Sequence, residues 1–335
     1  MQSVTNHYIY IKTNTWWAKV KKKFYQLSHG KEYYHYTIEY YLHEALKHIR
    51  HQQYDIILLE NRPDYAIKLK DITEARLVYH LHNEKLSYQV AHYREIYDAA
   101  SRILTVSDYI SSRVRTINPS DTKCIRVHNG SDITLFHPGK PSKITRSQLH
   151  IADDDFILYF SGRIIPEKGV LELIKAVRLL DHPHIKLLII GSSFYGNVKA
   201  DSPYIQALKA EAKAIQERII FTGYIPYTEL PNYLWISDVA VVPSLWEEPF
   251  GNTVVEAMAA GVPLITTRSG GIPEICEGVA TIVERDDIVN SLAQSILDLY
   301  EHPEKRRQLS AAALERSRQF DKDTYARNFF EALTA

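Results

Sequence analysis

The sequence is poor in cysteine and has no long apolar run. Two cysteines, Cys124 and Cys276, occur among 335 residues, which excludes a disulfide-rich scaffold and favours a reduced chain. No window approaches the ~18 consecutive apolar residues that a membrane-spanning helix needs. The opening residues contain neither a basic segment nor an apolar one, so we expect no signal peptide. These absences predict a cytoplasmic protein.

The chain also lacks net charge, because 40 lysines and arginines balance 40 aspartates and glutamates. The balance is uneven along the chain: residues 1–140 hold 20 basic and 14 acidic side chains, and the remainder holds 20 and 26. A basic front part favours contact with an anionic surface such as the inner leaflet of a membrane, although such an excess is also ordinary scatter. We expect no nucleic-acid partner.

One short segment bears on that membrane contact. Trp16 and Trp17 are followed by Lys19 and by the run Lys21–Lys23. Aromatic and cationic side chains together suit the headgroup region of a bilayer, so the segment fits an interfacial anchor. It fits equally well a solvated basic helix that packs one of its two tryptophans. The sequence leaves both interpretations open.

Length and pattern predict two α/β domains. A chain of 335 residues exceeds one ordinary core and suits two domains of about 150 residues each. Short apolar runs alternate with helical stretches, which is typical of βαβ units and parallel sheets. The segment Phe136–Ser147, with two prolines and a glycine, is the expected linker. We therefore predict domains over residues 1–137 and 138–319, and a last helix over 320–335 that packs back on the first domain.

The expected strands place the candidate site, because ligands of such folds bind outside the carboxyl ends of the strands. In the first domain the expected strands are Tyr8–Lys12, Ile56–Leu59, Leu77–Leu81, Ile103–Val106 and Ile125–Val127. In the second domain they are Ile157–Ser161, Lys186–Gly191, Ile219–Thr222, Val239–Pro243, Leu264–Thr267 and Ala280–Ile282. Helices are expected between the strands.

The most informative segment is Glu247–Gly261, with the sequence EEPFGNTVVEAMAAG. Gly251 lets the backbone approach a ligand, and Asn252 is a good N-cap for the helix that follows. The N-terminus of that helix would offer free N–H groups to a diphosphate. Glu256, about one turn inside, can accept two ribose hydroxyls, and Gly261 is expected to end the helix.

Two further strand ends carry candidate ligand contacts. The strand that ends at Gly162 is followed by Arg163 and, five residues later, by Lys168. An arginine can fork onto phosphate oxygens and a lysine supplies a point charge. The segment Phe221–Tyr224 ends a strand with a glycine and a large side chain. Tyr224 therefore lies where a nucleotide base could stack.

These motifs resemble those of glycosyltransferase family 4, which has the GT-B fold. The segments IIGSS at Ile189–Ser193 and SGGIPEI at Ser269–Ile275 belong to the same pattern. So do VSDYI at Val106–Ile110 and HNGSDITLF at His128–Phe136. The three donor segments, IIGSS and SGGIPEI make five motifs in family order, which are specific where each alone is weak. The resemblance runs from about residue 54 to the C-terminus, is greatest to spore-coat-associated and cell-surface polysaccharide transferases, and implies two Rossmann-like doubly wound α/β domains facing across a cleft.

The resemblance also implies roles for the donor-site residues. The residues that match Arg163 and Lys168 hold the diphosphate of the donor in that family. The glutamate that matches Glu256 binds the ribose, and the one that matches Glu248 lies against the donor sugar. The backbone over Phe250–Asn252 contacts sugar and phosphate.

The implied reaction is sugar transfer with retention of configuration and without a divalent metal. In a front-face internal return, the leaving phosphate helps to deprotonate the acceptor, and the protein stabilises the charge that grows on that phosphate. The histidine that matches His82 faces the donor sugar across the cleft. His80 and His82 stand two residues apart, but with no cysteine or carboxylate cluster near them we expect no metal site. Asp153–Asp155 precedes a strand at the end away from ligands, so we expect a solvated turn there.

The front of the chain departs from the family pattern. The usual first strand and its glycine-rich loop are missing, and the first glycine is Gly30. Either the N-terminus is cut back or the first domain is shorter by nature, and the acceptor side is the part affected.

We expect a retaining glycosyltransferase of the hexosyltransferase type. Its donor would be a nucleoside diphosphate sugar, with UDP favoured and no cofactor. Its acceptor would be lipid-linked or polymeric, in cell-envelope or exopolysaccharide synthesis, with peripheral contact at the inner membrane. One alternative is a non-catalytic accessory or coat protein that keeps the donor fold. Another is an epimerase or a phosphorylase on the same scaffold.

Overall fold

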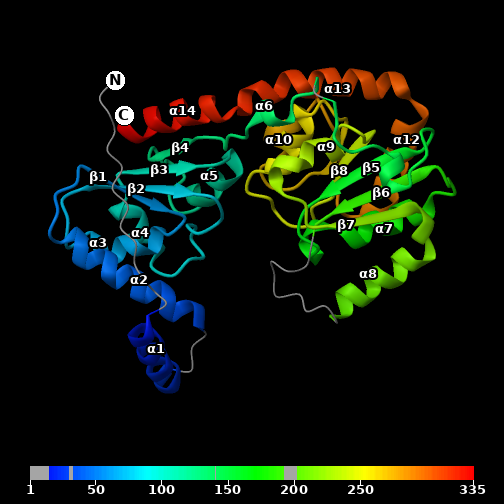
Figure 1. Cartoon of the computed structure of the whole chain (residues 1–335). Coiled ribbons are helices and arrows are strands. Elements are labelled where there is room, and N and C mark those ends of the chain that lie inside the picture. The colour runs from blue at the N-terminus through cyan, green and yellow to red at the C-terminus, as the bar shows by residue number, and fades with distance from the viewer. Residues whose placement is uncertain (1–14, 30–32, 140, 192–201) are drawn as a thin grey trace.

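The computed structural model describes residues 15–29, 33–139, 141–191 and 202–335, and it contains two parallel sheets (Figure 1). The strand expected at Tyr8–Lys12 lies outside the described residues. Within the part of the chain that is described, no helix has the length and hydropathy to cross a bilayer.

The first sheet has four parallel strands in the order β1-β2-β3-β4. These strands are β1 (Ile56–Glu60), β2 (Arg76–Leu81), β3 (Arg102–Thr105) and β4 (Cys124–Arg126). The helices of this domain are α1 (Trp16–His29), α2 (Tyr33–Ile49), α3 (Ala66–Leu69), α4 (Tyr93–Ala99) and α5 (Asp108–Arg115). Ser107 caps α5 as predicted, since its hydroxyl accepts the N–H of Ile110 at 3.1 Å.

The second sheet has six parallel strands in the order β10-β9-β8-β5-β6-β7. They are β5 (Phe156–Ser161), β6 (Ile185–Ile190), β7 (Ile219–Gly223), β8 (Val239–Val242), β9 (Leu264–Thr267) and β10 (Thr281–Val283). The order runs outward in both directions from the neighbours β5 and β8. This reversal creates a switch point, and the crevice outside it is where doubly wound folds bind ligands.

Helices cover both faces of the second sheet because each face of its central strand is apolar. Leu158 and Phe160 pack on one side of β5, and Ile157 and Tyr159 pack on the other. The helices are α7 (Val170–Leu179), α8 (Pro203–Ala214), α9 (Leu230–Leu234), α10 (Asn252–Ala259), α11 (Ile272–Cys276) and α12 (Ile288–Glu301). A parallel sheet buried on both faces needs such continuous apolar strands.

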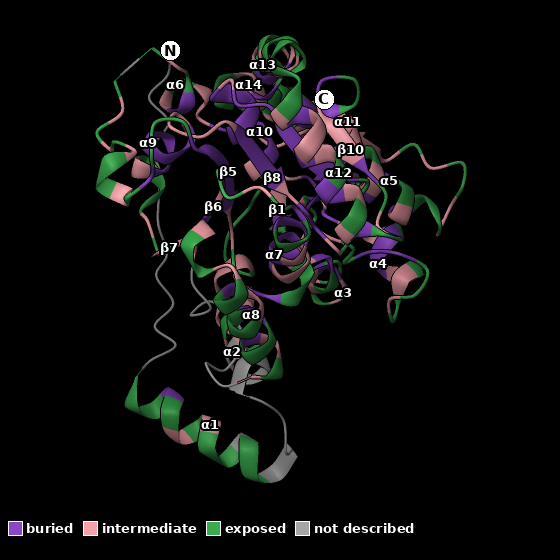
Figure 2. Ribbon diagram, turned by 90° about the vertical axis from the view of Figure 1, so that its right-hand side faces the viewer, coloured by how far each residue is buried: buried purple, intermediate pink, exposed green. Residues whose placement is uncertain are grey.

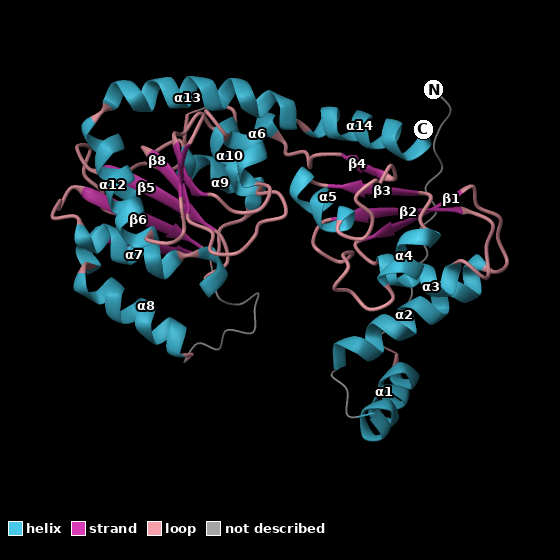
Figure 3. Cartoon of the chain, turned by 180° about the vertical axis from the view of Figure 1, so that it is seen from behind, coloured by secondary structure: helices cyan, strands magenta, loops and turns pink. Residues whose placement is uncertain are grey.

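Two chain segments join the domains. The first contains α6 (Ile133–Phe136), and the second contains α13 (Pro303–Ser317) and α14 (Lys322–Thr334), which run across the top in Figures 1 and 3. Helix α13 contacts α10, whereas α14 packs on the first sheet, where Ala332 joins a cluster with Val78 and Leu104. The guanidinium of Arg102 donates to the carbonyl of Ala332 at 2.7 Å. The last helix thus returns to the first domain, while the boundaries drawn at residues 137 and 319 stay predictions.

The contact with α14 explains one glycine of the HNG motif. A Cβ added at Gly130 would lie 2.6 Å from the Cβ of Tyr325, so only glycine lets the chain pass α14 this closely.

The exposed helix α1 corrects one interpretation of the sequence. Trp16 and Trp17 are each 66% exposed, so the alternative with one packed tryptophan is wrong. Figure 2 shows α1 as a largely exposed helix beside the compact domains.

Candidate active site

The candidate donor residues gather at the carboxyl edge of the second sheet. Strands β5 and β6 end side by side, and the N–H of Gly162 donates to the carbonyl of Ile190 at 3.0 Å. Gly191 has a φ of 149°, and a Cβ there would lie 1.9 Å from the carbonyl oxygen of Gly162. The two glycines therefore keep the strand ends close together and leave room above them.

A cavity of about 380 Å³ opens at this edge. Its lining residues are Ser161, Gly162, Arg163, Ile190, Gly191, Tyr224, Ile225, Tyr227 and Leu230. Three residues predicted from the sequence, Gly162, Arg163 and Tyr224, thus share one cavity. Tyr224 is 68% exposed at its mouth. Tyr227 was missed, because it begins a three-residue 3-10 helix (Tyr227–Glu229) and carries no motif signal.

Arg163 and Lys168 differ in how they are held. Arg163 is exposed, and within the described ranges no carboxylate forms an ion pair with it. The ammonium of Lys168 instead pairs with the carboxylate of Glu248. The hydroxyl of Ser244 donates to the same carboxylate at 2.8 Å. Glu248 is only 8% exposed, so these two partners fix its position.

The turn into α10 corrects one prediction. Asn252 is the first residue of the helix and not its N-cap, because the cap is Gly251 with a φ of 121° and no side chain caps the helix. The carbonyl of Gly251 accepts the N–H of Val254 at 3.0 Å. The first N–H groups of the helix have no partner within it and point beyond its N-terminus, as an anion site requires. Gly261 follows the helix with a φ of 66° and ends it as predicted.

Glu256 is a buried carboxylate that lies inside α10. It is 8% exposed, and burial raises its pKa to about 7 even though a hydrogen bond from Tyr227 lowers it. A carboxylate in this environment gains from any further donor that reaches it. Two ribose hydroxyls would be such donors, which is the role that the resemblance implies for this residue.

The glycine pair of the SGG motif supports the loop that carries Glu248. Gly270 has a φ of 51°, and a Cβ there would lie 2.2 Å from the carbonyl oxygen of Glu248. The N–H of Gly271 donates to that same carbonyl at 2.8 Å. The pair therefore lets two loops touch through their backbones, and any larger side chain at Gly270 would push Glu248 away.

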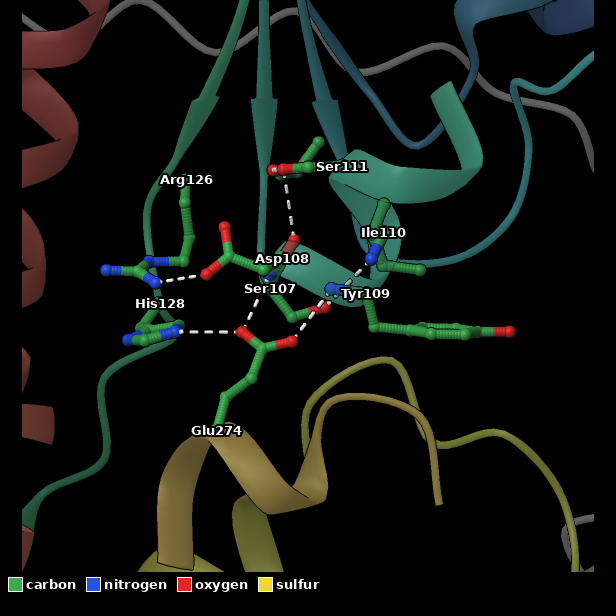
Figure 4. A network of polar contacts seen from close by, with 9 residues as sticks. Ser107, Asp108, Tyr109, Ile110, Ser111, Arg126, His128 and Glu274 are labelled. Carbon is green, nitrogen blue, oxygen red and sulfur yellow. Dashed lines mark hydrogen bonds and ion pairs between the residues drawn. The ribbon is translucent and has the colours of Figure 1, made fainter. Parts of the chain in front are cut away.

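The same motif joins the two domains through a contact that the sequence did not reveal. Glu274, on α11, accepts the backbone N–H groups of Asp108 and Tyr109 at 2.7 Å each (Figure 4). Its carboxylate also lies 3.4 Å from Nε2 of His128. The carboxylate thus caps the N-terminus of α5 across the domain boundary, where both free N–H groups and the helix dipole favour a negative charge.

On the first domain, His82 follows directly after β2 at the carboxyl edge. Its Nε2 lies 3.1 Å from Oε2 of Glu60, and Nδ1 of the buried His80 lies 2.8 Å from Oε1 of the same residue. Burial pushes the pKa of Glu60 up, but hydrogen bonds from both histidines outweigh it and hold this pKa at about 2. A permanently ionised carboxylate therefore holds both imidazoles.

This arrangement corrects the premise that no carboxylate lies near the two histidines. One ligand-type atom from each of Glu60, His80 and His82 lies within 4.8 Å of the others, a spacing at which a metal ion could bind. The expectation of a metal-free site stays a prediction. The turn at Asp153–Asp155 is solvated as expected at Asp153 and Asp154, but Asp155 is 6% exposed and accepts the N–H of Ala152 at 3.0 Å.

Comparison with known proteins defines the class. The crystal structure of HepE from Anabaena in complex with UDP superposes with a TM-score of 0.77, over 88% of this chain and 81% of that one, at 23% identity. This likeness shows the GT-B fold of glycosyltransferases, with two Rossmann-like domains as predicted.

The family follows from the sequence comparisons. The model of the family described as glycosyl transferases group 1 matches residues 142–316. YtcC of Bacillus subtilis (strain 168), named as a glycosyltransferase, is 31% identical over 281 residues, which are 80% of this chain and 69% of that protein. Spore coat protein SA of the same organism is 29% identical over 295 residues, 84% of this chain and 78% of that protein. The chain belongs to the glycosyl transferases group 1 family and is a glycosyltransferase.

Proposed function

We propose that this glycosyltransferase transfers a sugar from a UDP-sugar, with retention of configuration, to a lipid-linked or polymeric glycan acceptor. The observation that carries the proposal is the cavity lined by Arg163, Tyr224 and Tyr227, because Tyr227 also hydrogen-bonds the buried carboxylate of Glu256, whose pKa burial raises to about 7. The UDP that is bound to HepE, on the same fold, supports the choice of nucleotide.

In this proposal the nucleotide extends from the cavity to the start of α10. The base stacks near Tyr224, and the ribose donates its hydroxyls to Glu256. The diphosphate lies between Arg163 and the N-terminus of α10, and it accepts hydrogen bonds from the guanidinium and from free backbone N–H groups. Backbone atoms over Phe250–Asn252 contact sugar and phosphate.

The chemistry is assigned to the charges around the leaving phosphate. Arg163 and Lys168 stabilise the negative charge that develops there as the glycosidic bond breaks. Glu248, held by Lys168, lies against the donor sugar and fixes its orientation. His82 faces the sugar from the first domain, and the departing phosphate takes the proton of the acceptor hydroxyl. Retention follows because both events occur on one face of the sugar.

A thermal-shift panel with UDP, GDP, ADP, TDP and CDP, each with and without EDTA, tests the donor assignment. A ligand that binds only the folded state raises the melting temperature once its concentration exceeds its dissociation constant. We expect UDP to give the largest shift, to keep it in EDTA, and to lose it in Arg163→Ala. The absence of a shift with every nucleotide would favour the alternative of an accessory protein that keeps only the donor fold.

A further inference from the structure

Helix α1 carries an apolar stripe that faces solvent. Trp16, Val20, Phe24 and Leu27 recur at the spacing of one helix face. The exposed fractions are 66% for Trp16, 69% for Phe24 and 77% for Leu27. Trp17, seven residues before Phe24, widens the stripe on the same side and is itself 66% exposed. A contiguous apolar patch of such exposed side chains usually marks a surface that a partner or a membrane covers.

The stripe and the buried residue of α1 lie on opposite sides of the helix. Among the α1 side chains whose burial is described, Ala18 is the buried one, at 3% exposure. It follows Trp16 by two positions, which places it about 200° around the helix, on the opposite side. Helix α1 contacts α2. No residue of the stripe belongs to a buried apolar cluster of the described residues.

Lysines border the stripe on both sides. Lys19 and Lys23 stand one turn apart along one border, and Lys21 stands on the other. The helix contains no aspartate or glutamate. Two such helices would bring like charges together, which disfavours a second copy of this chain as the partner. An anionic surface with an apolar interior satisfies both the lysines and the tryptophans.

The place of α1 in the fold agrees with this partner. Figures 1 and 3 show α1 at the far end of the first domain from α13 and α14, which bridge the two domains at the other end. A planar surface in contact with α1 would therefore leave the bridging helices free. It would lie on the side of the molecule that these helices do not cross.

We propose that α1 lies in the interface of an anionic phospholipid bilayer, with its tryptophans, Phe24 and Leu27 at headgroup depth and its lysines on the lipid phosphates. The acceptor is then a glycan that the bilayer itself holds through a lipid anchor. This second statement rests on the proposed glycosyl transfer, whereas the first does not.

Sedimentation of the full chain with lipid vesicles tests the proposal. One set of vesicles is phosphatidylcholine alone, and the other contains phosphatidylcholine and phosphatidylglycerol in equal amounts. We expect binding to the mixed vesicles, weakened by salt because part of it is electrostatic. Trp16→Ser with Trp17→Ser should lower the partition coefficient by about tenfold or more. Lys19→Gln with Lys23→Gln should lower it by roughly tenfold.

Matched controls come from the bridging helices. Phe330→Ser removes an aromatic side chain that is 65% exposed on α14, and Lys305→Gln with Arg307→Gln removes two exposed charges on α13. Both controls should bind the mixed vesicles as the parent does. All substitutions lie at exposed positions, so unchanged melting temperatures should confirm that each variant is folded.

Three results would overturn the proposal. The parent could sediment no better with mixed vesicles than with neutral ones, or the tryptophan variant could bind as the parent does. Light scattering could also show that the parent is a dimer and that the tryptophan variant is a monomer, in which case a second copy covers the stripe. The nucleotide shift is measured without vesicles, so failure of membrane binding is separable from failure of the donor assignment.

Discussion

The carboxyl edges of the two sheets hold their acidic residues in different ways. In the second domain, Glu248 and Glu256 are each 8% exposed. In the first domain, the side chain of Glu60 is 55% exposed and that of its partner His82 is 38% exposed. The acidic residues of the proposed donor site are therefore buried, whereas Glu60 and His82 of the first domain are open to solvent. We infer that nucleotide binding depends on the second domain alone and that the first domain acts on the transfer step.

The largest effect should come from removing a charge beside the leaving phosphate. We expect Arg163→Ala to lower the transfer rate constant by about 10²–10³-fold, because the developing charge loses a preorganised donor. Turnover with the UDP-sugar that gives the strongest thermal shift measures this effect. Arg178→Ala is the control, since it removes an exposed arginine of α7 that pairs with Glu211 of α8. Equal losses in the two variants would contradict the assignment.

Glu256→Gln should show how far the ionised buried carboxylate lowers the free energy of unfolding. The folded-state pKa of about 7 lies above the ordinary value of 4.5, so ionisation destabilises the folded protein as the pH rises through this window. The ligand-free variant should therefore be more stable than the parent by about 3 kcal/mol near pH 8, with a gain that fades towards pH 5.

Chemical denaturation at several pH values measures the difference in unfolding free energy. The variant Glu301→Gln, at an exposed position, is the control. A gain in Glu256→Gln that is the same at all pH values would mean that Glu256 titrates normally.

The contact between the two domains can be tested by substitution of Glu274. Glu274→Ala removes two charge-assisted hydrogen bonds to the N-terminus of α5 and should lower the unfolding free energy by about 1–3 kcal/mol. Glu277→Ala, which removes an exposed neighbour paired with Arg268, should cost less than about 1 kcal/mol. Denaturant titration of both variants provides the test, and equal costs would show that the contact contributes little.

The smallest expected effect concerns the positioning of His82. Glu60→Gln should lower turnover by about tenfold, because an ionised carboxylate no longer orients both imidazoles, while UDP affinity stays unchanged. Glu74→Gln, at the amino end of β2, is the control. Steady-state kinetics and nucleotide titration together check this prediction. A loss of UDP affinity in Glu60→Gln would show that the first domain takes part in donor binding.

The difference between buried and exposed side chains also explains which features the sequence could predict. Parallel strands with apolar runs, such as β5 and β6, were placed within a residue or two, because burial on both faces leaves a strong pattern. The donor motifs were visible because close backbone contacts demand glycine, as at Gly270. The pairing of Glu60 with His80 and His82 joins residues 20 and 22 positions apart through neighbouring strands, and no local pattern reports it.

Two further features could be recognised only in the structure. The cap that Glu274 places on α5 spans more than 160 residues, and a glutamate in the motif Ser269–Ile275 gives no sign of a partner in the other domain. Asn252 is a favoured capping residue, yet Gly251 takes the cap because the loop enters the helix with a positive φ. Backbone geometry there overrides the side-chain preference.

The central claim is that Glu256 and the cavity beside it form a nucleotide site within the second domain. Titration calorimetry of UDP into the parent, Glu256→Gln and Glu60→Gln tests it most directly. The account predicts one site in the parent, an affinity lowered by about tenfold or more in Glu256→Gln, and an unchanged affinity in Glu60→Gln. Equal affinities of the parent and Glu256→Gln, or no binding to the parent, would contradict it.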